Sequence, residues 1–150
     1  MIITKAKTTD AIALSELSLR SKAYWGYSPT QIELWKSILT ITEAYIQKNS
    51  IYHLMDGDSI LGYYSYMPVT DKKVILDNLF VAPEEIGKGY GRILLSAFLN
   101  QIKNNGFNSI LLYSDPHAEA FYLKFGFSVI GQQATSIKNR FIPIMQLYLT

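Results

Sequence analysis

The spacing of apolar residues over the first fifty positions is mainly that of helices. Residues 2–6 form a short β-branched run that predicts a strand, and Thr8, Thr9 and Asp10 then offer N-cap candidates for a helix ending near Gly26. A second helix is predicted to begin at Ser28-Pro29, because proline suits the first helical position. The string TITEAYI at 40–46 adds a short helical turn. The apolar positions assigned to the two longer helices are Ala13, Leu14, Leu17, Tyr24, Ile32, Trp35 and Leu39.

From Ile51 onward the apolar spacing changes to that of strands. Three strands are predicted over residues 51–55, 60–69 and 74–81, with turns at Asp56-Gly57-Asp58 and at residues 70–73. A helix then follows a glycine-rich loop and ends at residues 104–106. The apolar face assigned to it comprises Tyr90, Ile93, Leu94, Ala97, Phe98 and Ile102. The remaining predicted elements are a strand at 109–113, a short helix at 116–125, and closing strands at 127–130 and 142–149.

The predicted order of elements is β-α-α-β-β-β-α-β-α-β-β, which is typical of a mixed α+β domain. The chain has 150 residues, which suits a single domain over residues 1–150. Its second half contains one clear β-loop-α-β unit, in which the glycine-rich loop connects the strand to the helix.

Composition narrows the function classes. Net charge is only +2, and the 14 Lys and Arg residues are scattered, so a nucleic-acid partner is not expected. The chain has no cysteine and two histidines, so we expect neither disulfides nor a metal site. It shows neither the basic-then-apolar order of a signal peptide nor an apolar run long enough for a membrane span. We therefore expect a cytoplasmic protein without a membrane partner.

The loop PEEIGKGYGRILL, residues 83–95, has glycines at three alternate positions: Gly87, Gly89 and Gly91. A helix N-terminus exposes backbone N–H groups, and glycine lets the backbone approach a phosphate closely, so the loop suits an anion. It is not a P-loop, because Gly87-Lys88 is not followed by Ser or Thr. It also lacks the spacing of a dinucleotide fingerprint. A tight turn without any ligand is the alternative.

Two segments together resemble the GNAT superfamily of N-acetyltransferases. The string LDNLFVAPEEIGKGYGRILLSAFL resembles that family's acetyl-CoA-binding core, in which [Q/R]-x-x-G-x-[G/A] wraps the coenzyme pyrophosphate. Gly89 and Gly91 match the two small positions, whereas Ile86 stands where Gln or Arg is usual. DPHAEAFYLKFGF, residues 115–127, resembles N-x-x-A-x-x-F-Y-x-K-x-G-F, with Asp115 in place of Asn. Both motifs stand in the expected order and spacing.

The resemblance implies a GNAT-like fold, a central mixed and mostly antiparallel sheet of six or seven strands flanked by about four helices. It implies that acetyl-CoA is the cofactor, without a metal. It also implies that the backbone N–H groups of the strand before the loop polarise the acetyl carbonyl and receive the pantetheine arm. The residues expected to bind the coenzyme are Leu79, Phe80, Val81, Ile86, Gly87, Lys88, Gly89, Tyr90, Gly91, Arg92, Asp115, Ala118 and Tyr122. For Lys88 and Arg92 a solvated basic flank is the alternative.

Acetyl transfer to an amine needs a proton donor for the departing thiolate and a route for the amine proton. The resemblance places Tyr122 as the donor beside the coenzyme sulfur, and a packed core tyrosine is the alternative. Asp77 interrupts the apolar strand VILDNLFV, where a carboxylate is costly unless paired or solvated. The resemblance places acids near this position as bases, and a structural or solvent-facing acid is the alternative. Glu84, Glu85, His53 and His117 are expected to have structural or solvent-exposed roles.

The acceptor side of this fold is expected at the first two helices and their connection. There Tyr24, Trp25 and Tyr27 cluster, and Tyr64 on a strand could line the same cleft; helix packing is the alternative for these rings. The leading hypothesis is direct acetyl transfer to a primary amine of a small molecule or peptide, since no cysteine is available for an acyl-enzyme. The alternative is a non-catalytic acyl-CoA-binding regulatory module. The closing strands could pair across a homodimer.

Overall fold

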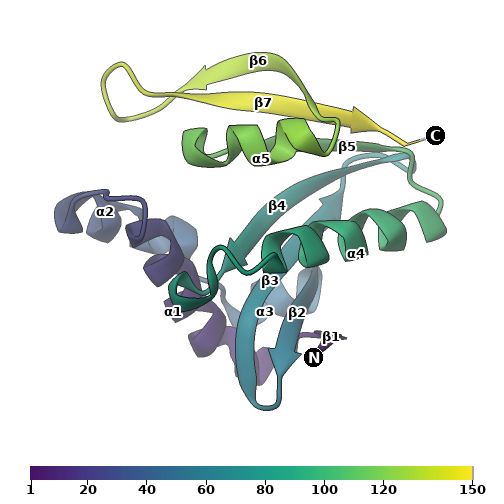
Figure 1. The fold of residues 1–150 in the computed structure, drawn as a ribbon, viewed down its shortest axis with the longest axis horizontal. Coiled ribbons are helices and arrows are strands. Elements are labelled where there is room, and N and C mark those ends of the chain that lie inside the picture. The colour runs from purple at the N-terminus through teal and green to yellow at the C-terminus, as the bar shows by residue number, and fades with distance from the viewer. Residues whose placement is uncertain (150) are drawn as a thin grey trace. The chain divides into compact units, whose positions relative to one another are not determined.

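A computed structural model describes residues 1–149 (Figure 1). These residues form two compact units. The first unit comprises Met1–Tyr66 and Asn78–Asn100. The second comprises Met67–Asp77 and the chain from Gln101 onward. The chain passes from one unit to the other within β3, within β4 and within α4. Each unit is described separately below.

The first unit contains the N-terminal helices and four strands. Its elements, including the three that lie partly in the second unit, are β1 (Ile2–Lys5), η1 (Thr8–Asp10), α1 (Ala11–Ala23), α2 (Pro29–Leu39), α3 (Glu43–Lys48), β2 (Ser50–Asp56), β3 (Ser59–Pro68), β4 (Lys73–Val81), η2 (Pro83–Glu85) and α4 (Tyr90–Asn104).

The strands of the first unit are neighbours in chain order, β1-β2-β3-β4. β1 and β2 pair antiparallel from Ile2↔Met55 to Lys5↔Tyr52. β2 and β3 form the predicted hairpin, in which Gly57 takes the left-handed conformation (φ 60°) that its turn requires. This confirms the predicted strands and the turn between them.

Local signals set the helix starts differently from one helix to the next. Ser28 caps α2 as predicted, because its hydroxyl oxygen accepts a hydrogen bond from Gln31 N at 3.1 Å and Pro29 occupies the first helical position. At the start of α1, Asp10 occupies the N-cap position, as one of the predicted candidates, but its side chain makes no capping hydrogen bond to the helix. Asp10 Oδ2 instead accepts from Lys7 N at 2.8 Å, across a short 3-10 turn. Instead of a single turn, a helix, α3, begins within TITEAYI at Glu43 and is capped by Thr42.

The first unit has an apolar layer on each face of its sheet. Tyr63 points to the face covered by α1 and α3, where its hydroxyl bonds Ser18, while the next residue, Tyr64, points to the face covered by α4. The buried apolar residues on the α1 and α3 side are Ala6, Ala11, Leu14, Leu17, Ile41, Ile46, Ile51, Tyr63 and Ala82.

Three predicted core positions on the helices were wrong. Ala13 and Tyr24 are exposed, because the buried stripe of α1 runs through Leu14, Leu17, Ser18 and Ser21 instead. Ile93 is also exposed, and Leu95 takes its place beside Leu94 in the buried face of α4. Of the other predicted positions, Leu14, Leu17, Leu94, Phe98 and Ile102 are buried.

The second unit has strand order β4-β5-β7-β6, with β5 (Ser109–Tyr113), η3 (Pro116–Ala118), α5 (Glu119–Lys124), β6 (Ser128–Ala134) and β7 (Phe141–Tyr148). β4 and β5 are parallel, whereas β7 pairs antiparallel with both β5 and β6. α4 ends at Asn104, within the predicted stop, and is followed by Gly106 (φ 88°); Phe107 N donates to Ile102 O at 3.0 Å. Val74, Ile110 and Met145 are fully buried in this unit.

The described residues thus form five α-helices and a mixed, mostly antiparallel sheet of seven strands. The number of helices is one more than predicted. The added helix is α3. None of the helices described between residues 1 and 149 has both the length and the apolar character that crossing a membrane would require.

Candidate coenzyme and catalytic site

The glycine loop has the backbone geometry of a cradle. Gly87 (φ 90°) and Gly89 (φ 86°) both lie in the left-handed region, where a side chain is strained. A Cβ at either position would meet no other atom of the protein within 4 Å, so the space in front of the loop is open. The helical hydrogen bonds of α4 begin with Ile93 N donating to Gly89 O at 3.2 Å. The N–H groups of Tyr90, Gly91 and Arg92 therefore precede the ladder at the positive end of the helix.

Two ion pairs flank this loop. Arg20 Nη1 donates to Glu84 Oε2 at 2.9 Å and to Glu84 Oε1 at 3.2 Å, which joins the end of α1 to η2. The backbone N–H of Glu84 and the Arg20 guanidinium lower the pKa of Glu84. Lys88 Nζ lies 2.8 Å from Glu85 Oε2, and this pairing raises the pKa of Lys88. Lys88 thus already has a carboxylate partner, while the Arg92 side chain is exposed.

The strand before the loop, β4, is paired with β5 only near its start. β4 pairs with β5 at Lys73↔Ser109, Val74↔Ile110 and Ile75↔Leu111, whereas β4 itself runs on to Val81. Within the first unit β4 is the last strand in the order. Leu79, Phe80 and Val81 are half-buried there. This is the edge at which backbone N–H groups were expected to meet a thioester carbonyl.

The two predicted catalytic side chains lie in the second unit and differ in environment. Asp77 in β4 is exposed. Tyr122 in α5 is only 7% exposed and packs edge to face against Phe121 and Phe127, with ring centroids 5.3 and 5.5 Å away. Burial raises the pKa of Tyr122 above its ordinary value, so its phenol stays protonated.

Asp115 is held by contacts that the sequence did not reveal. Its Oδ1 accepts from His117 N at 2.9 Å and lies 2.8 Å from His117 Nδ1, and its Oδ2 accepts from Arg140 Nη2 at 3.3 Å. Arg140 precedes β7 and was not singled out in the sequence, because 25 residues separate it from Asp115. Ala118, the N-cap of α5, is half-buried and donates its N–H to Asp115 O at 2.9 Å.

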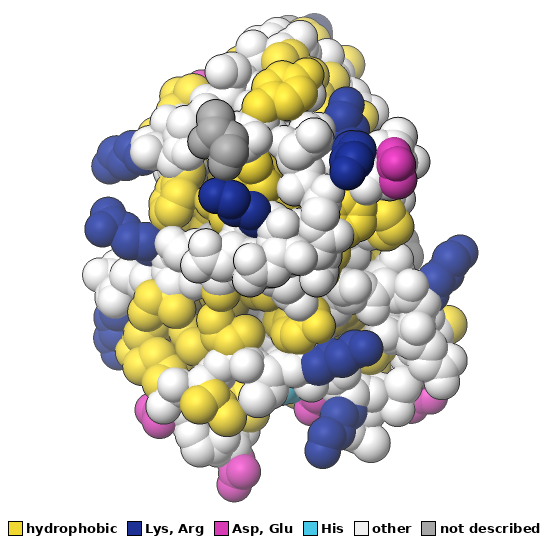
Figure 2. Space-filling view, turned by 90° about the vertical axis from the view of Figure 1, so that its right-hand side faces the viewer, with side chains coloured by type: hydrophobic (Ala, Val, Ile, Leu, Met, Phe, Trp, Pro, Cys, Tyr) yellow, Lys and Arg dark blue, Asp and Glu magenta, His cyan; other side chains and the backbone are white. Residues whose placement is uncertain are grey.

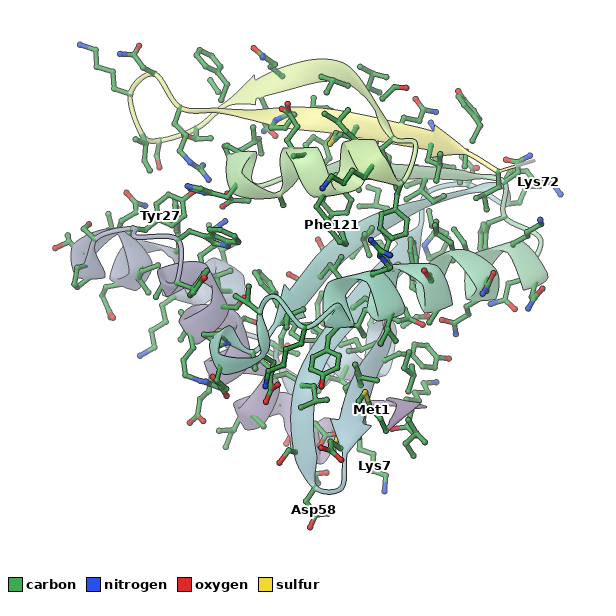
Figure 3. The ribbon with its side chains drawn as sticks, viewed as in Figure 1. Met1, Lys7, Tyr27, Asp58, Lys72 and Phe121 are labelled. Atoms are coloured by element: carbon green, nitrogen blue, oxygen red, sulfur yellow. The ribbon has the colours of Figure 1, made fainter. Side chains whose placement is uncertain are left out.

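The four aromatic candidates for the acceptor side have different environments. Tyr24 and Trp25 are exposed and contact each other edge to face at 5.0 Å, whereas Tyr27 contacts Trp35 of α2. Tyr64 is 1% exposed and stacks between Tyr52 and Tyr66, and this burial raises its pKa. Tyr64 is therefore a core residue rather than part of an open cleft, which corrects that expectation. Figure 3 labels Tyr27 near the junction of α1 and α2.

Other polar residues have structural partners. His53 is buried in β2, with Nε2 3.1 Å from Asp10 Oδ2 and Nδ1 3.1 Å from Thr4 Oγ1, as a satisfied core histidine should be. Asn78, beside Asp77, donates Nδ2 to Ser65 Oγ at 2.9 Å and to Tyr45 OH at 3.3 Å. Over residues 1–149 no three His, Cys, Asp or Glu side chains gather closely enough to hold a metal ion.

The sequence-predicted residues are divided between the two units. The first unit brings together the glycine loop, residues 79–81 of β4 and the aromatic residues around the α1–α2 connection. The second unit holds Asp77, Asp115, Ala118 and Tyr122.

The family described as acetyltransferase (GNAT) domain matches residues 26–149, a span that includes both motifs. The chain belongs to this family. Among curated proteins it resembles an uncharacterized N-acetyltransferase of Gracilaria tenuistipitata, with 22% identity over 94 residues. That match covers 63% of this chain and 52% of the relative, so the matched segment spans about half the relative's own length.

Solved structures share the fold along the whole chain. The PaiA N-acetyltransferase of Thermoplasma acidophilum, in complex with coenzyme A, has a TM-score of 0.81 and 21% identity, with 98% of each chain covered. The ribosomal-protein-S18-alanine N-acetyltransferase of Escherichia coli has a TM-score of 0.75 and 20% identity, covering 99% of this chain and 94% of that one. A Salmonella typhimurium protein solved with its cofactor acetyl-CoA has a TM-score of 0.72 and 22% identity, covering 100% and 94%. At these identities the likeness shows the GNAT fold.

Proposed function

We propose that the chain transfers an acetyl group from acetyl-CoA to a primary amine of a small molecule or peptide. The observation that carries the proposal is the pair of left-handed glycines, Gly87 and Gly89, open to solvent and placed directly before α4. In a chain of the GNAT family this loop is where a coenzyme pyrophosphate is expected. The coenzyme-bound structures of PaiA and of the Salmonella protein support the choice of ligand.

Coenzyme binding would rely on backbone groups more than on side chains. Ile86 cannot donate a hydrogen bond from its side chain, and Lys88 is paired with Glu85, so the N–H groups from Gly87 to Arg92 would carry most of the phosphate contacts. The edge of β4 at residues 79–81 offers further N–H and C=O groups. The amides of the pantetheine arm would pair with that edge as an added strand does.

The chemical step would be direct. The lone pair of the neutral amine attacks the thioester carbonyl, a C–N bond forms, and the oxyanion accepts hydrogen bonds from β4 N–H groups. The C–S bond then breaks, and the departing thiolate takes the phenolic proton of Tyr122. The amine nitrogen loses one proton as it becomes an amide. Because burial raises the pKa of Tyr122, the phenol is in its donor form at neutral pH.

Asp77 is the proposed acceptor of the amine proton, through water. Its exposed side chain is consistent with a carboxylate that contacts solvent and could pass a proton to it. The primary-amine partner, a cytoplasmic location and pairing of the closing strands in a homodimer belong to the same proposal.

A regulatory acyl-CoA-binding module is the second candidate function. The observation that favours it is the environment of Asp115, which stands where the family motif has Asn. Its carboxylate is already engaged by His117 and Arg140, so it is less available to a coenzyme than a free amide would be. Such a module would bind acetyl-CoA without turning it over.

The release of free thiol from acetyl-CoA with a panel of primary amines separates the two functions. We expect thiol release with at least one amine, and a fall of about 100-fold in kcat for Tyr122→Phe with little change in coenzyme affinity, since general acids contribute roughly 10²–10⁴ in rate. Tyr113→Phe, an exposed tyrosine of β5, is the control and should retain wild-type kcat. Unchanged kcat in Tyr122→Phe would remove Tyr122 as the acid. Coenzyme binding without thiol release from any amine would favour the regulatory module.

A further inference from the structure

An arginine of α1 lies at the start of the glycine loop. Arg20 Nη1 donates to both carboxylate oxygens of Glu84, at 2.9 and 3.2 Å, and Glu84 belongs to η2, two residues before Ile86. Figure 1 shows the loop before α4 lying against α1. All of these residues belong to the first unit. A guanidinium from a distant part of the sequence is thus hydrogen-bonded to the turn from which the loop begins.

The fold holds both ends of this contact in place. Leu17 of α1 and Ala82, the N-cap of η2, are buried in the same apolar cluster. The turn of η2 is closed by Glu85 N, which donates to Ala82 O at 2.8 Å. The helix that carries Arg20 and the turn that carries Glu84 are therefore packed together beneath the ion pair, although both charged side chains are exposed.

The guanidinium of Arg20 has donors that the ion pair does not use. An arginine side chain has N–H groups on Nη1, Nη2 and Nε, all in one plane. Within residues 1–149 only Nη1 of Arg20 makes hydrogen bonds, whereas Nη2 and Nε donate to no group of the protein. A planar set of donors with a full positive charge suits phosphate oxygens, which accept charge-assisted hydrogen bonds.

The start of the loop needs a cation from elsewhere in the chain. Arg92 follows the glycines, so a positive charge is present at the end of the loop. At its start, Ile86 has no donor in its side chain, and Lys88 Nζ is paired with Glu85 Oε2 at 2.8 Å. Backbone N–H groups at a helix start carry only partial charges. Arg20 supplies a full charge on that side.

We propose that Arg20 is a coenzyme-binding residue, which keeps Nη1 on Glu84 while Nη2 and Nε donate to the pyrophosphate of coenzyme A. The inference rests on the proposed acetyl transfer and adds to it a side chain from outside the glycine loop. Glu84 would orient the plane of the guanidinium, and its own negative charge is offset by the pairing. The coenzyme site would then include a residue of α1 that precedes Glu84 by 64 positions.

Calorimetric titration with coenzyme A tests Arg20 without requiring turnover. We expect Arg20→Gln to raise the Kd at least tenfold, because hydrogen bonds between charged groups are among the strongest. Lys48→Gln is the matched control, since Lys48 is also an exposed cation in the last turn of a helix, α3, of the first unit. It should change the Kd by less than about twofold. Equal Kd values in the two variants would overturn the proposal.

A Glu84→Gln background separates a phosphate ligand from a simple counter-charge. If Arg20 donates to the pyrophosphate, Arg20→Gln should raise the Kd for coenzyme A at least fivefold in this background as well. If Arg20 only offsets the charge of Glu84, the second substitution should leave the Kd unchanged there, and that result would overturn the proposal. Because both side chains are exposed, all of these variants should melt within about 2 °C of the wild type.

Titration with 3′-dephospho-coenzyme A identifies the phosphate that Arg20 contacts. This ligand keeps the pyrophosphate, so Arg20→Gln should weaken it by the same factor as coenzyme A. A loss with coenzyme A alone would place Arg20 at the 3′-phosphate and contradict the assignment. If the wild type binds neither ligand, the proposed acetyl transfer and this inference both fail. If binding depends on Arg20 but no amine is acetylated, the coenzyme site stands and only the transfer fails.

Discussion

At the scale of single residues, the backbone of Gly87 and Gly89 is the feature most directly tied to a ligand. Their φ angles of 90° and 86° disfavour any side chain by about 1–2 kcal/mol. The protein itself leaves open space where their Cβ atoms would lie. A side chain at either position would therefore introduce backbone strain in the free protein, and it would collide only with a bound ligand. Gly106, with φ 88° and equally open surroundings, has the same local geometry at the other end of α4.

This pair of glycines allows a matched prediction. Gly89→Ala and Gly106→Ala should each lower the free energy of unfolding by about 1–2 kcal/mol, because both place a Cβ at positive φ. Only Gly89→Ala should also weaken acetyl-CoA binding, by at least tenfold, because its methyl group would lie between the backbone and the pyrophosphate. Calorimetric titration with acetyl-CoA and urea unfolding measure the two effects. Equal coenzyme affinity in both variants would contradict the proposed clamp.

At the scale of elements, Gly62 fixes how closely β3 approaches β4 and α4. A Cβ at Gly62 would lie 2.7 Å from Phe80 O and 2.8 Å from Leu94 Cδ1, both shorter than any normal contact. The absence of a side chain therefore lets the strand before the glycine loop and the helix after it pack against the same point of β3. The close packing at Gly62 therefore positions the glycine loop, which connects this strand to this helix.

We expect Gly62→Ala to destabilise the protein by about 1–3 kcal/mol, because a carbonyl oxygen of the backbone cannot move aside as a flexible side chain can. Gly131→Ala in β6 is the matched control. Its added Cβ would make an ordinary contact, 3.6 Å from Ile144 Cδ1, and should change stability by less than about 0.5 kcal/mol. Urea midpoints of the two variants test this. A Gly62→Ala midpoint equal to that of Gly131→Ala would show that the close packing around Gly62 relaxes without cost.

At the scale of the whole molecule, the proposed function draws on residues from both units. The glycine loop and residues 79–81 lie in the first unit, whereas Asp77 and Tyr122 lie in the second, and β4 runs through both. The overall charge of +2 favours an anionic coenzyme only weakly. On the face drawn in Figure 2 the Lys and Arg side chains are dispersed rather than gathered in one stripe. Affinity for the coenzyme should therefore come from the loop rather than from a general positive field.

Acetyl-CoA at 100 times its Kd should stabilise the folded protein by about 2.7 kcal/mol. For a chain of this length that corresponds to a rise in Tm of about 5–10 °C. ATP with Mg²⁺ is the comparison ligand, because the loop lacks the Lys-Ser or Lys-Thr pair that holds nucleotide phosphates and the metal. We expect no comparable rise with ATP in a thermal melt. A rise with ATP and none with acetyl-CoA would contradict the choice of coenzyme.

The elements could be predicted well from the sequence where local chemistry dominates. The Asp56-Gly57-Asp58 turn, the Ser28-Pro29 helix start and the glycine stop at Gly106 all follow from conformational preferences of a few adjacent residues. The predictions failed where a residue's environment comes from distant segments. Tyr64 was a candidate for lining a cleft but lies in a stack with Tyr52 and Tyr66, and Ile93 was assigned to the apolar face of its helix but is exposed.

The sequence by itself thus determined the order of elements apart from α3, the two family motifs and the glycine loop, because each is encoded in contiguous residues. The tertiary structure decided which charges and rings of separate elements have partners. The pair of Lys88 with Glu85 could be anticipated from their spacing. The contacts of Arg20 with Glu84, of Asp115 with Arg140 and of Lys22 with the Trp35 ring instead join separate elements. Such contacts depend on how helices and strands pack, and no local pattern encodes that packing.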